Sequence, residues 1–479
     1  MQRRLFLRKI GLGAVGLWAI PQIVQSCTKD PLHAEATPDE LADSPWADGK
    51  GDRSRVPRSV VVIGAGAAGM YAASWLKARG CTVKILESSE RRGGRVKALT
   101  GFADFPVELG AEIIHGNNSM LYRWAQQQGA QFVNYSPVDY FRLDGQLFSE
   151  PQIEDDPHVI AAWAFSENAT SYQGPDKTVA QRVAEVGLPS RVHHIVNADV
   201  GNEYGTDNQH LSIKGIAQED AAWTAGNGDY PMRNRTFAQI MDATFANILP
   251  DILYNTKAVR IEYPAGSGKP RVKDQAGVWH TADAVLLTVP LPVLQNNAIE
   301  FSPALPTWKT AAIQNIGMGA GMKIIFKFSQ RFWASNLRFL TSDQLGHEFW
   351  YTSKQRGNDH VLTLFVMGGR AATLSAQGAG AVATVVAELD ALYGNNAASS
   401  ALIGSHIEDW GKNPHIGGAY SFPVVGGGGL ATRRDLSKKL NDKLFFAGEA
   451  THFAGHSATL HGALETGLRA AKEIRAALK

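Results

Sequence analysis

The sequence predicts an α/β fold of two interleaved domains, one built on a parallel sheet and the other of α+β type. A short β-branched run, Ser59–Ile63, leads directly into a glycine-rich turn and then into a stretch with helical spacing. Residues 114–235 hold helix-like segments, whereas residues 301–423 hold apolar strand-like runs such as Met322–Phe328. The length of 479 residues exceeds what one hydrophobic core usually organises, which indicates more than one domain.

Composition excludes several classes of protein. Hydrophobic residues make up 44% of the chain and charged residues 19%, which suits a large buried core and excludes a disordered or fibrous protein. The formal net charge of +2 argues against a nucleic-acid partner, because such a protein needs a basic surplus. Cys27 and Cys81 are the only cysteines, so neither a disulfide scaffold nor a Cys-rich zinc site is expected. Since no His pair has a ligand spacing backed by a third ligand, we expect no metal.

Residues 1–27 predict an export signal. Arg3 and Arg4, followed by Leu5-Phe6-Leu7, resemble a twin-arginine signal. The uncharged stretch 10–27 is rich in glycine and too short for a comfortable membrane span, which needs ~20 apolar residues. Residues 28–56 are polar and read as a flexible linker. We therefore expect an exported, periplasmic protein.

The end of this signal leaves two interpretations open. Val24-Gln25-Ser26-Cys27 looks like a lipoprotein processing box, with Cys27 as the lipidated residue. The alternative is a plain cleaved signal peptide with an incidental cysteine. Any membrane attachment is expected through Cys27 alone.

Residues 59–87 have the layout of a complete βαβ unit. The run Ser59–Ile63 predicts a buried parallel strand, Met70–Arg79 a helix that ends at Gly80, and Cys81–Leu86 a second strand. Such a unit is typical of a Rossmann-type nucleotide-binding domain.

The residues of the turn predict a dinucleotide ligand. Gly64 allows the tight turn, Gly66 lets the backbone approach a pyrophosphate, and Gly69 lets the helix pack on the strand. Glu87 lies 23 residues after Gly64 at a strand end, where its carboxylate can accept hydrogen bonds from both ribose hydroxyls. Slightly further on, a second glycine pair next to Arg95 allows another close backbone approach and adds a cation for the pyrophosphate.

These motifs, together with five later ones, resemble the FAD-dependent amine oxidases. That family includes monoamine oxidases, polyamine and spermine oxidases, and lysine-specific histone demethylases; the motifs are closest to the polyamine, spermine and monoamine oxidases. The later motifs span residues 107–116, 283–294, 317–333, 410–421 and 446–467. The resemblance therefore extends from about residue 58 to the end of the chain.

The resemblance implies a Rossmann-type FAD-binding domain interleaved with an α+β substrate domain. The FAD-binding domain is expected in three parts, residues 57–113, 236–300 and 424–479. The substrate domain is expected in two, residues 114–235 and 301–423.

The resemblance also implies which residues hold FAD. They are Gly64, Gly66, Ala68, Gly69, Glu87, Gly94, Arg95, Gly110, Ala111, Val259, Gly448, Glu449 and Thr459. Ala419 stands where monoamine oxidases carry the cysteine that bonds flavin, so FAD is expected to be non-covalent.

Four residues are implied in catalysis. Lys323 matches a buried lysine that holds a water against flavin N5; otherwise it is a solvated residue of an edge strand. His115 matches a histidine that lines the catalytic tunnel of polyamine-type enzymes, with a hydrogen-bonded structural histidine as the alternative. Tyr420 matches the aromatic residue beside the flavin, with a tyrosine of the core as the alternative. His456 occupies the place of a second aromatic wall, which Phe453 could fill instead.

The resulting expectation is an exported amine oxidase that transfers a hydride from a C–N bond to flavin N5. The imine product then hydrolyses to a carbonyl compound, and O2 or a periplasmic electron acceptor reoxidises the flavin. Two alternatives remain open: a flavin-dependent desaturase of the wider superfamily, and a non-catalytic flavin-binding protein.

Overall fold

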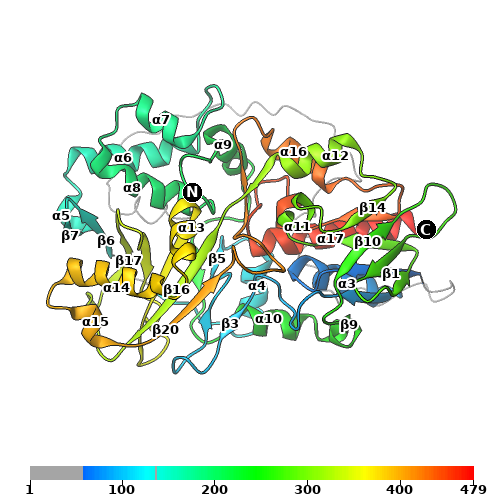
Figure 1. Cartoon of the computed structure of the whole chain (residues 1–479), viewed down its shortest axis with the longest axis horizontal. Helices are drawn as coiled ribbons and strands as arrows, with labels where there is room; N and C mark the ends of the chain where they lie inside the picture. Colours follow the sequence, from blue (N-terminus) through cyan, green and yellow to red (C-terminus); the bar gives the residue numbers. More distant parts are fainter. Residues whose placement is uncertain (1–57, 135–137) are drawn as a thin grey trace.

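A five-stranded parallel sheet forms the centre of the first domain (Figure 1). The computed structural model describes residues 58–134 and 138–479, so the predicted export signal, linker and Cys27 lie outside the described residues. All four strand pairs of the sheet are parallel. In spatial order the strands are β22 (Leu444–Phe446), β13 (Ala284–Leu287), β1 (Ser59–Ile63), β2 (Thr82–Leu86) and β9 (Ile252–Leu253).

Both faces of this sheet are covered, which explains the unbroken apolar run of β1. Val60 and Val62 pack into the core on the helix side, and Val61 and Ile63 pack into the core on the other side. Helices α3 (Ala67–Ala78) and α17 (Leu460–Ala477) contact each other closely (Figure 1). Their contact requires Gly467, because a Cβ atom there would lie 2.3 Å from the Ala68 carbonyl oxygen. The opposite core includes a second sheet, in the order β12 (Trp279–Thr281), β11 (Arg271–Asp274), β10 (Ala258–Glu262) and β14 (Glu300–Ser302).

The second domain is organised around a seven-stranded mixed sheet. Its strands, in spatial order, are β20 (Leu402–Asp409), β16 (Gly321–Phe328), β19 (His360–Met367), β18 (Glu348–Trp350), β17 (Leu337–Thr341), β6 (Val138–Leu143) and β7 (Gln146–Ser149). Strand β16 pairs along its length with β19 and β20 and is therefore an inner strand.

Several helices contact the second sheet, and three two-stranded pairs lie outside the large sheets of the described residues. The helices of these regions are α5 (Glu150–Ile153), α6 (Pro157–Ala169), α7 (Val179–Glu185), η2 (Ser190–Val192), α8 (His193–Val196), η3 (Asn197–Asn202), α9 (Ile213–Ala221), α13 (Gly368–Gln377), α14 (Gly380–Tyr393) and α15 (Ala397–Ala401). The two-stranded pairs are β3 (Ala98–Leu99) with β4 (Val107–Glu108), β5 (Ile113–His115) with β8 (Asp229–Pro231), and β15 (Ile316–Met318) with β21 (Ser421–Pro423). The remaining helices are α4 (Met120–Gln127), α10 (Phe237–Thr244), η4 (Ala246–Asp251), α11 (Leu291–Gln295), α12 (Thr307–Gln314), α16 (Gly429–Ser437) and η5 (Glu449–Thr451).

The fold matches the expected α/β architecture of two interleaved domains. Segments far apart in sequence supply each sheet, since the parallel sheet alone draws on strands from β1 to β22. Within the described ranges, no helix combines the length and the apolar character that a membrane crossing requires.

Candidate active site

The glycine turn after β1 forms one end of the site, and each glycine has a different steric reason. Gly64 has a φ of +107°, a conformation that side chains rarely adopt. A Cβ atom on Gly69 would lie 2.0 Å from the Gly64 carbonyl oxygen, so this glycine brings α3 against the turn. A Cβ atom on Gly66 would meet nothing within 4 Å, and Gly66 lines the main cavity. The turn therefore leaves space beside the first N–H groups of α3, where a phosphate can bind.

Glu87 lies directly after β2 and is buried beside this turn. Its carboxylate accepts hydrogen bonds from the Ala65 N–H (2.8 Å) and from the Ser89 N–H (2.9 Å) and hydroxyl (2.8 Å). These donors hold the carboxylate at the cavity wall, in the position expected for a ribose-binding acid.

Arg95 and Glu449 form an ion pair in the lining of the cavity. The Arg95 guanidinium donates to Glu449 Oε1 (2.9 Å) and to the Ala419 carbonyl (2.7 Å). Ser421 donates its hydroxyl to Glu449 Oε2 (2.6 Å). Burial alone would raise the pKa of Glu449, but the Arg95 charge and the Ser421 hydrogen bond lower it below its usual value. The Glu449 carboxylate is therefore ionised, and its hydrogen bonds hold it in one position in the site.

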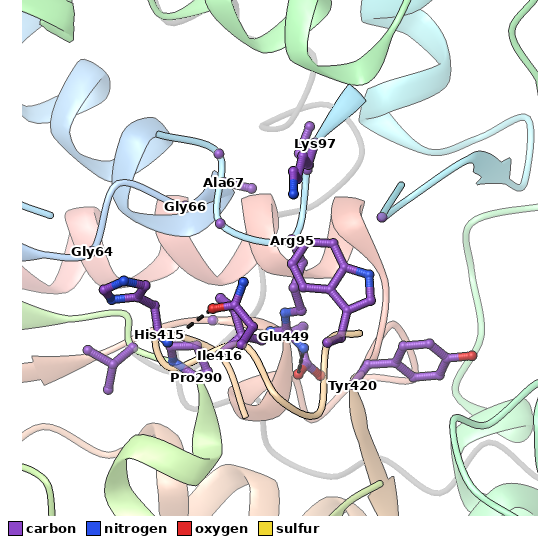
Figure 2. A pocket seen from close by; sticks show the side chains of 18 of the residues that line it. Gly64, Gly66, Ala67, Arg95, Lys97, Pro290, His415, Ile416, Tyr420 and Glu449 are labelled. Atoms are coloured by element: carbon purple, nitrogen blue, oxygen red, sulfur yellow. Dashed lines mark hydrogen bonds and ion pairs between the residues drawn. The ribbon is translucent and has the colours of Figure 1, made fainter. Parts of the chain in front are cut away.

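A single cavity of about 680 Å³ joins the glycine turn to the second domain, a size typical of ligand sites. Figure 2 shows Gly64, Gly66 and His415 at one side of this cavity and Tyr420 at the other. The cavity brings together most of the residues predicted from the sequence. Its lining includes Gly64, Gly66, Ala68, Glu87, Gly94, Arg95, Gly110, Ala111, Gly448, Glu449, Thr459, Lys323, Tyr420 and His115.

Three predicted residues, Gly69, Val259 and His456, are not among those that line the cavity. Gly69 lies behind the turn, where the absence of a side chain lets α3 pack against Gly64. Val259 lies at a β-bulge between Ala258 and Arg260, and Ala258 is the residue of β10 that lines the cavity. Ala258, and not Val259, thus contributes to this wall of the cavity, and a contact of Val259 with FAD stays a prediction.

The prediction that His456 forms a second wall opposite Tyr420 is wrong. The His456 ring is buried, with Nδ1 bonded to Glu465 (2.7 Å) and Nε2 accepting from the Thr224 N–H (3.2 Å). Its ring packs edge-on against Trp223, with centroids 5.0 Å apart. The alternative, Phe453, is also buried and does not line the cavity. Of this loop, Ala458 and Thr459 line the cavity instead.

His456 belongs to a buried trio with His452 and Glu465, whose ligand atoms lie close enough to hold a metal ion. The hydrogen bonds account for the trio without one. His452 Nδ1 accepts the His456 N–H (3.0 Å), so its Nε2 carries the proton and donates to Glu465 (2.8 Å). By the same reasoning the Thr224 N–H leaves the proton of His456 on Nδ1, which donates to the same carboxylate. The His452–His456 spacing of four residues was the sequence signal for this trio, and Glu465 was the partner that spacing could not identify.

Lys323 is buried on β16 and lines the cavity. Its ammonium donates to the carbonyls of Glu108 (3.1 Å) and Gly110 (2.9 Å) and to Glu112 Oε2 (2.8 Å). It also lies 4.9 Å from the centroid of the Trp350 ring. Lys323 is thus neither solvated nor on an edge strand, but its three N–H groups have protein acceptors. A water could bind to this ammonium only by replacing one of them.

Glu112 holds two cations and was not singled out from the sequence. Its Oε1 accepts from Arg356 (3.0 Å), while its Oε2 accepts from Lys323. Burial alone would raise the pKa of Glu112, but the charges of Lys323 and Arg356 outweigh it and lower the pKa. Nearby, burial raises the pKa of Glu108 to about 8, although the Phe237 N–H bond opposes that shift. The ionised Glu112 carboxylate is therefore shared by the Lys323 and Arg356 cations.

His115 lies on β5 at the cavity wall. Its Nδ1 is bonded to Asp229 of the paired strand β8 (2.7 Å), so the two residues form a histidine–carboxylate pair. This bond leaves Nε2 as the ring nitrogen that Asp229 does not hold.

Aromatic side chains line the cavity at the second domain. Trp350 and Phe365 stack with ring centroids 4.6 Å apart, and both line the cavity together with Tyr420 and Met367. The strands β18 and β19 that carry Trp350 and Phe365 are mostly buried, so in sequence these residues look like ordinary core. We call the region of the cavity lined by Trp350, Phe365, Met367 and Tyr420 the aromatic chamber.

The residues of this cavity fit a flavin dinucleotide. The open space at Gly66, the fixed acid Glu87 and the Arg95–Glu449 pair supply the contacts that a pyrophosphate and its riboses need. The aromatic chamber continues the same cavity, so a reactive ring bound at the centre would face it.

Comparisons with known proteins agree with this arrangement. A family model described as flavin containing amine oxidoreductase matches residues 236–475, and a model of an NAD(P)-binding Rossmann-like domain matches residues 62–127. Polyamine oxidase 3 of Oryza sativa subsp. japonica is 30% identical over 464 residues, which cover 88% of this chain and 90% of that protein. Lysine-specific histone demethylase 2 of Homo sapiens is 26% identical over 455 residues, which cover 88% of this chain and 53% of that protein.

Solved structures share the fold. Cyclohexylamine oxidase from Brevibacterium oxydans IH-35A superposes with a TM-score of 0.74 at 20% identity, covering 88% of this chain and 100% of its own. Wild-type putrescine oxidase bound to putrescine gives a TM-score of 0.71 at 17% identity, covering 88% of this chain and 99% of its own. At these identities the likeness concerns the fold.

Proposed function

We propose that this chain, which belongs to the family of flavin-containing amine oxidoreductases, oxidises a C–N bond of a small amine in the aromatic chamber after export from the cytoplasm. The chain is an FAD-dependent amine oxidase. The proposal rests on one observation above all: a single cavity joins the glycine turn to a chamber that contains Lys323, His115 and Tyr420.

FAD, when bound, supplies the chemistry by accepting a hydride equivalent from the carbon next to nitrogen. The chain holds FAD through the turn at Gly64 and Gly66, through Glu87, and through the Arg95–Glu449 pair. Attachment is proposed to be non-covalent, because Ala419 has no thiol. Cys81, the one cysteine among the described residues, is not part of the cavity lining.

His115 is proposed to take the proton that an amine must lose before oxidation. An ammonium has no lone pair to stabilise the cation that forms at carbon, so the reacting amine has to be neutral. Asp229 orients the His115 ring through Nδ1, which leaves Nε2 to accept the proton within the cavity. The imine product then hydrolyses to a carbonyl compound, and O2 or another electron acceptor reoxidises the flavin.

An anaerobic screen of amines tests this function. We expect at least one primary or secondary amine to bleach the visible absorbance of oxidised flavin in the purified holoenzyme. Photoreduction of the same sample serves as the control for a reducible flavin. A flavin that light reduces but that no amine in a broad panel reduces would contradict amine oxidation and favour a flavin-binding protein of another function.

Export through the twin-arginine route is supported by the Arg3-Arg4 signal and by the need to fold around FAD where FAD is made. Replacement of both arginines by lysine should leave active holoenzyme in the cytoplasm, measured by fractionation and flavin fluorescence. The matched control is Arg8→Lys, the same substitution outside the pair. Unchanged export of the double variant would exclude this route, and loss of palmitate labelling in Cys27→Ala would identify a lipid anchor at Cys27.

A further inference from the structure

A π-helical turn, η3 (Asn197–Asn202), lies behind the aromatic chamber. Such turns are rare and occur frequently at functional sites. The last residue of this turn, Asn202, is completely buried. Its side chain and its backbone carbonyl both make hydrogen bonds to residues of the aromatic chamber.

The Asn202 side chain bonds to the strands that carry three chamber residues. Its Oδ1 accepts the Met367 N–H (2.9 Å), and its Nδ2 donates to the Phe365 carbonyl (3.4 Å). Nδ2 also donates to Glu348 Oε2 (3.4 Å), and Glu348 Oε1 accepts the indole N–H of Trp350 (2.5 Å). One amide thus connects Phe365 and Met367 directly and Trp350 through a single buried carboxylate.

The backbone beside Asn202 holds the fourth chamber residue. The Tyr420 hydroxyl donates to the carbonyls of Glu203 (3.0 Å) and Asn202 (3.3 Å). The Tyr420 ring also packs on Gly205, where a Cβ atom would lie 2.6 Å from Tyr420 Cε2. Tyr420 therefore rests on the same segment that anchors Trp350, Phe365 and Met367.

We propose that Asn202 is a positioning residue that holds Trp350, Phe365 and Tyr420 in one arrangement and so sets the amine selectivity of the chamber. The inference rests on the proposed function, since it concerns the binding of the amine that the enzyme oxidises. Hydrogen-bonded side chains behind a binding surface keep that surface in a single geometry, which matters most for rigid, bulky ligands.

The chain offers a matched control in the same turn. Asn197 is also buried, but its side chain bonds His347 Nε2 (3.0 Å) and accepts the Asn208 N–H (3.1 Å), and none of these residues lines the cavity. Asn197→Ala removes another buried amide from η3 at a residue that does not line the cavity. It therefore measures the structural cost of such a loss.

The experiment uses anaerobic stopped-flow reduction of holoenzyme by cyclohexylamine and by putrescine, which separates the apparent Kd from the limiting rate. We expect Asn202→Ala to raise the apparent Kd for the bulkier, rigid cyclohexylamine about tenfold, which corresponds to the loss of one or two hydrogen bonds. The apparent Kd for putrescine should rise less. FAD content should stay at the wild-type level, because the glycine turn is untouched. Asn197→Ala should lower the thermal midpoint but leave the Kd ratio of the two amines unchanged.

Equal Kd ratios in Asn202→Ala and Asn197→Ala would overturn the inference. Should Asn202→Ala fail to fold, Glu348→Gln decides, because Glu348 lies outside the cavity lining and joins Asn202 to Trp350, and a glutamine there can accept from only one of the two. An unchanged Kd ratio in Glu348→Gln would then overturn the inference, whereas a changed ratio supports it. If no amine in the panel reduces the wild-type flavin, the proposed function fails. If amines reduce the wild-type flavin and Asn202→Ala keeps the wild-type Kd ratio, only the inference about Asn202 fails.

Discussion

Glu112→Gln should lower the free energy of unfolding by about 3–5 kcal/mol, the usual cost of breaking a buried ion pair from one side. The substitution leaves Lys323 and Arg356 as two buried cations without the carboxylate they share, at side-chain exposures of 3% and 5%. Urea denaturation of the holoenzyme measures the change. Asp139→Asn is the matched control, because Asp139 pairs with the buried Arg338 (2.7 Å) and neither residue lines the cavity.

Substitution of Lys323 should affect stability and catalysis differently from substitution of Glu112. Lys323→Met leaves Glu112 paired with Arg356, so it should cost much less stability than Glu112→Gln. It should nevertheless slow flavin reoxidation or imine hydrolysis, because it removes the cation at the cavity wall. Asp139→Asn should lower stability while both half-reactions stay at the wild-type rate. Wild-type stability of Glu112→Gln would show that the two cations find other compensation, and wild-type half-reactions of Lys323→Met would make Lys323 a structural residue.

The pH dependence of stability gives an independent check on Glu112. Its pKa is lowered on folding, so its carboxylate stabilises the folded state fully above the unfolded value of ~4.3. That contribution is lost as the pH falls through the lower folded pKa. Glu112→Gln should therefore flatten the acid limb of the stability curve relative to wild type, and an unchanged limb would contradict the assignment.

Gly69→Ala should abolish FAD binding, because the new Cβ atom would lie 2.0 Å from the Gly64 carbonyl oxygen. Helix α3 would have to move away from the turn, and this distorts the phosphate site as well as the packing of α3 on β1. The expected result is a colourless protein with a lowered thermal midpoint. Retention of stoichiometric FAD would show that α3 can shift without affecting the site.

Gly66→Ala provides the contrasting case. A Cβ atom there meets no protein atom within 4 Å, so the apoprotein should keep its stability. The methyl group would point into the space that the cofactor needs, so FAD affinity should fall roughly 5- to 150-fold, as expected for about 1–3 kcal/mol of overpacking. Gly380→Ala is the control, because its Cβ atom would lie 3.9 Å from its nearest neighbour and outside the cavity. Unchanged FAD affinity in Gly66→Ala would place the pyrophosphate elsewhere.

The βαβ unit could be predicted from sequence because its determinants are local. The strand runs Ser59–Ile63 and Cys81–Leu86, the glycines between them and Glu87 all lie within about thirty residues of one another. Steric demands on such a short segment leave few conformations. The helix there begins at Ala67 and not at the predicted Met70, since the first turn carries the small residues of the glycine motif. Lys323 could be proposed for the site only through the family resemblance, because the strand run alone also fits a solvated lysine of an edge strand.

Only the tertiary structure determined the partners of these residues. Glu112 meets Lys323 across 211 positions of sequence and Arg356 across 244, and no spacing rule relates them. His456 shows the same limit: a motif gave its place in the loop, but Glu465 and the Thr224 N–H turn its ring away from the cavity. The sequence by itself determined the fold class, the family motifs and the dinucleotide turn, since these depend on contacts within short segments. The direction in which a buried polar side chain points depends on the donors and acceptors that the packed domains bring next to it. Only the tertiary structure decided that direction.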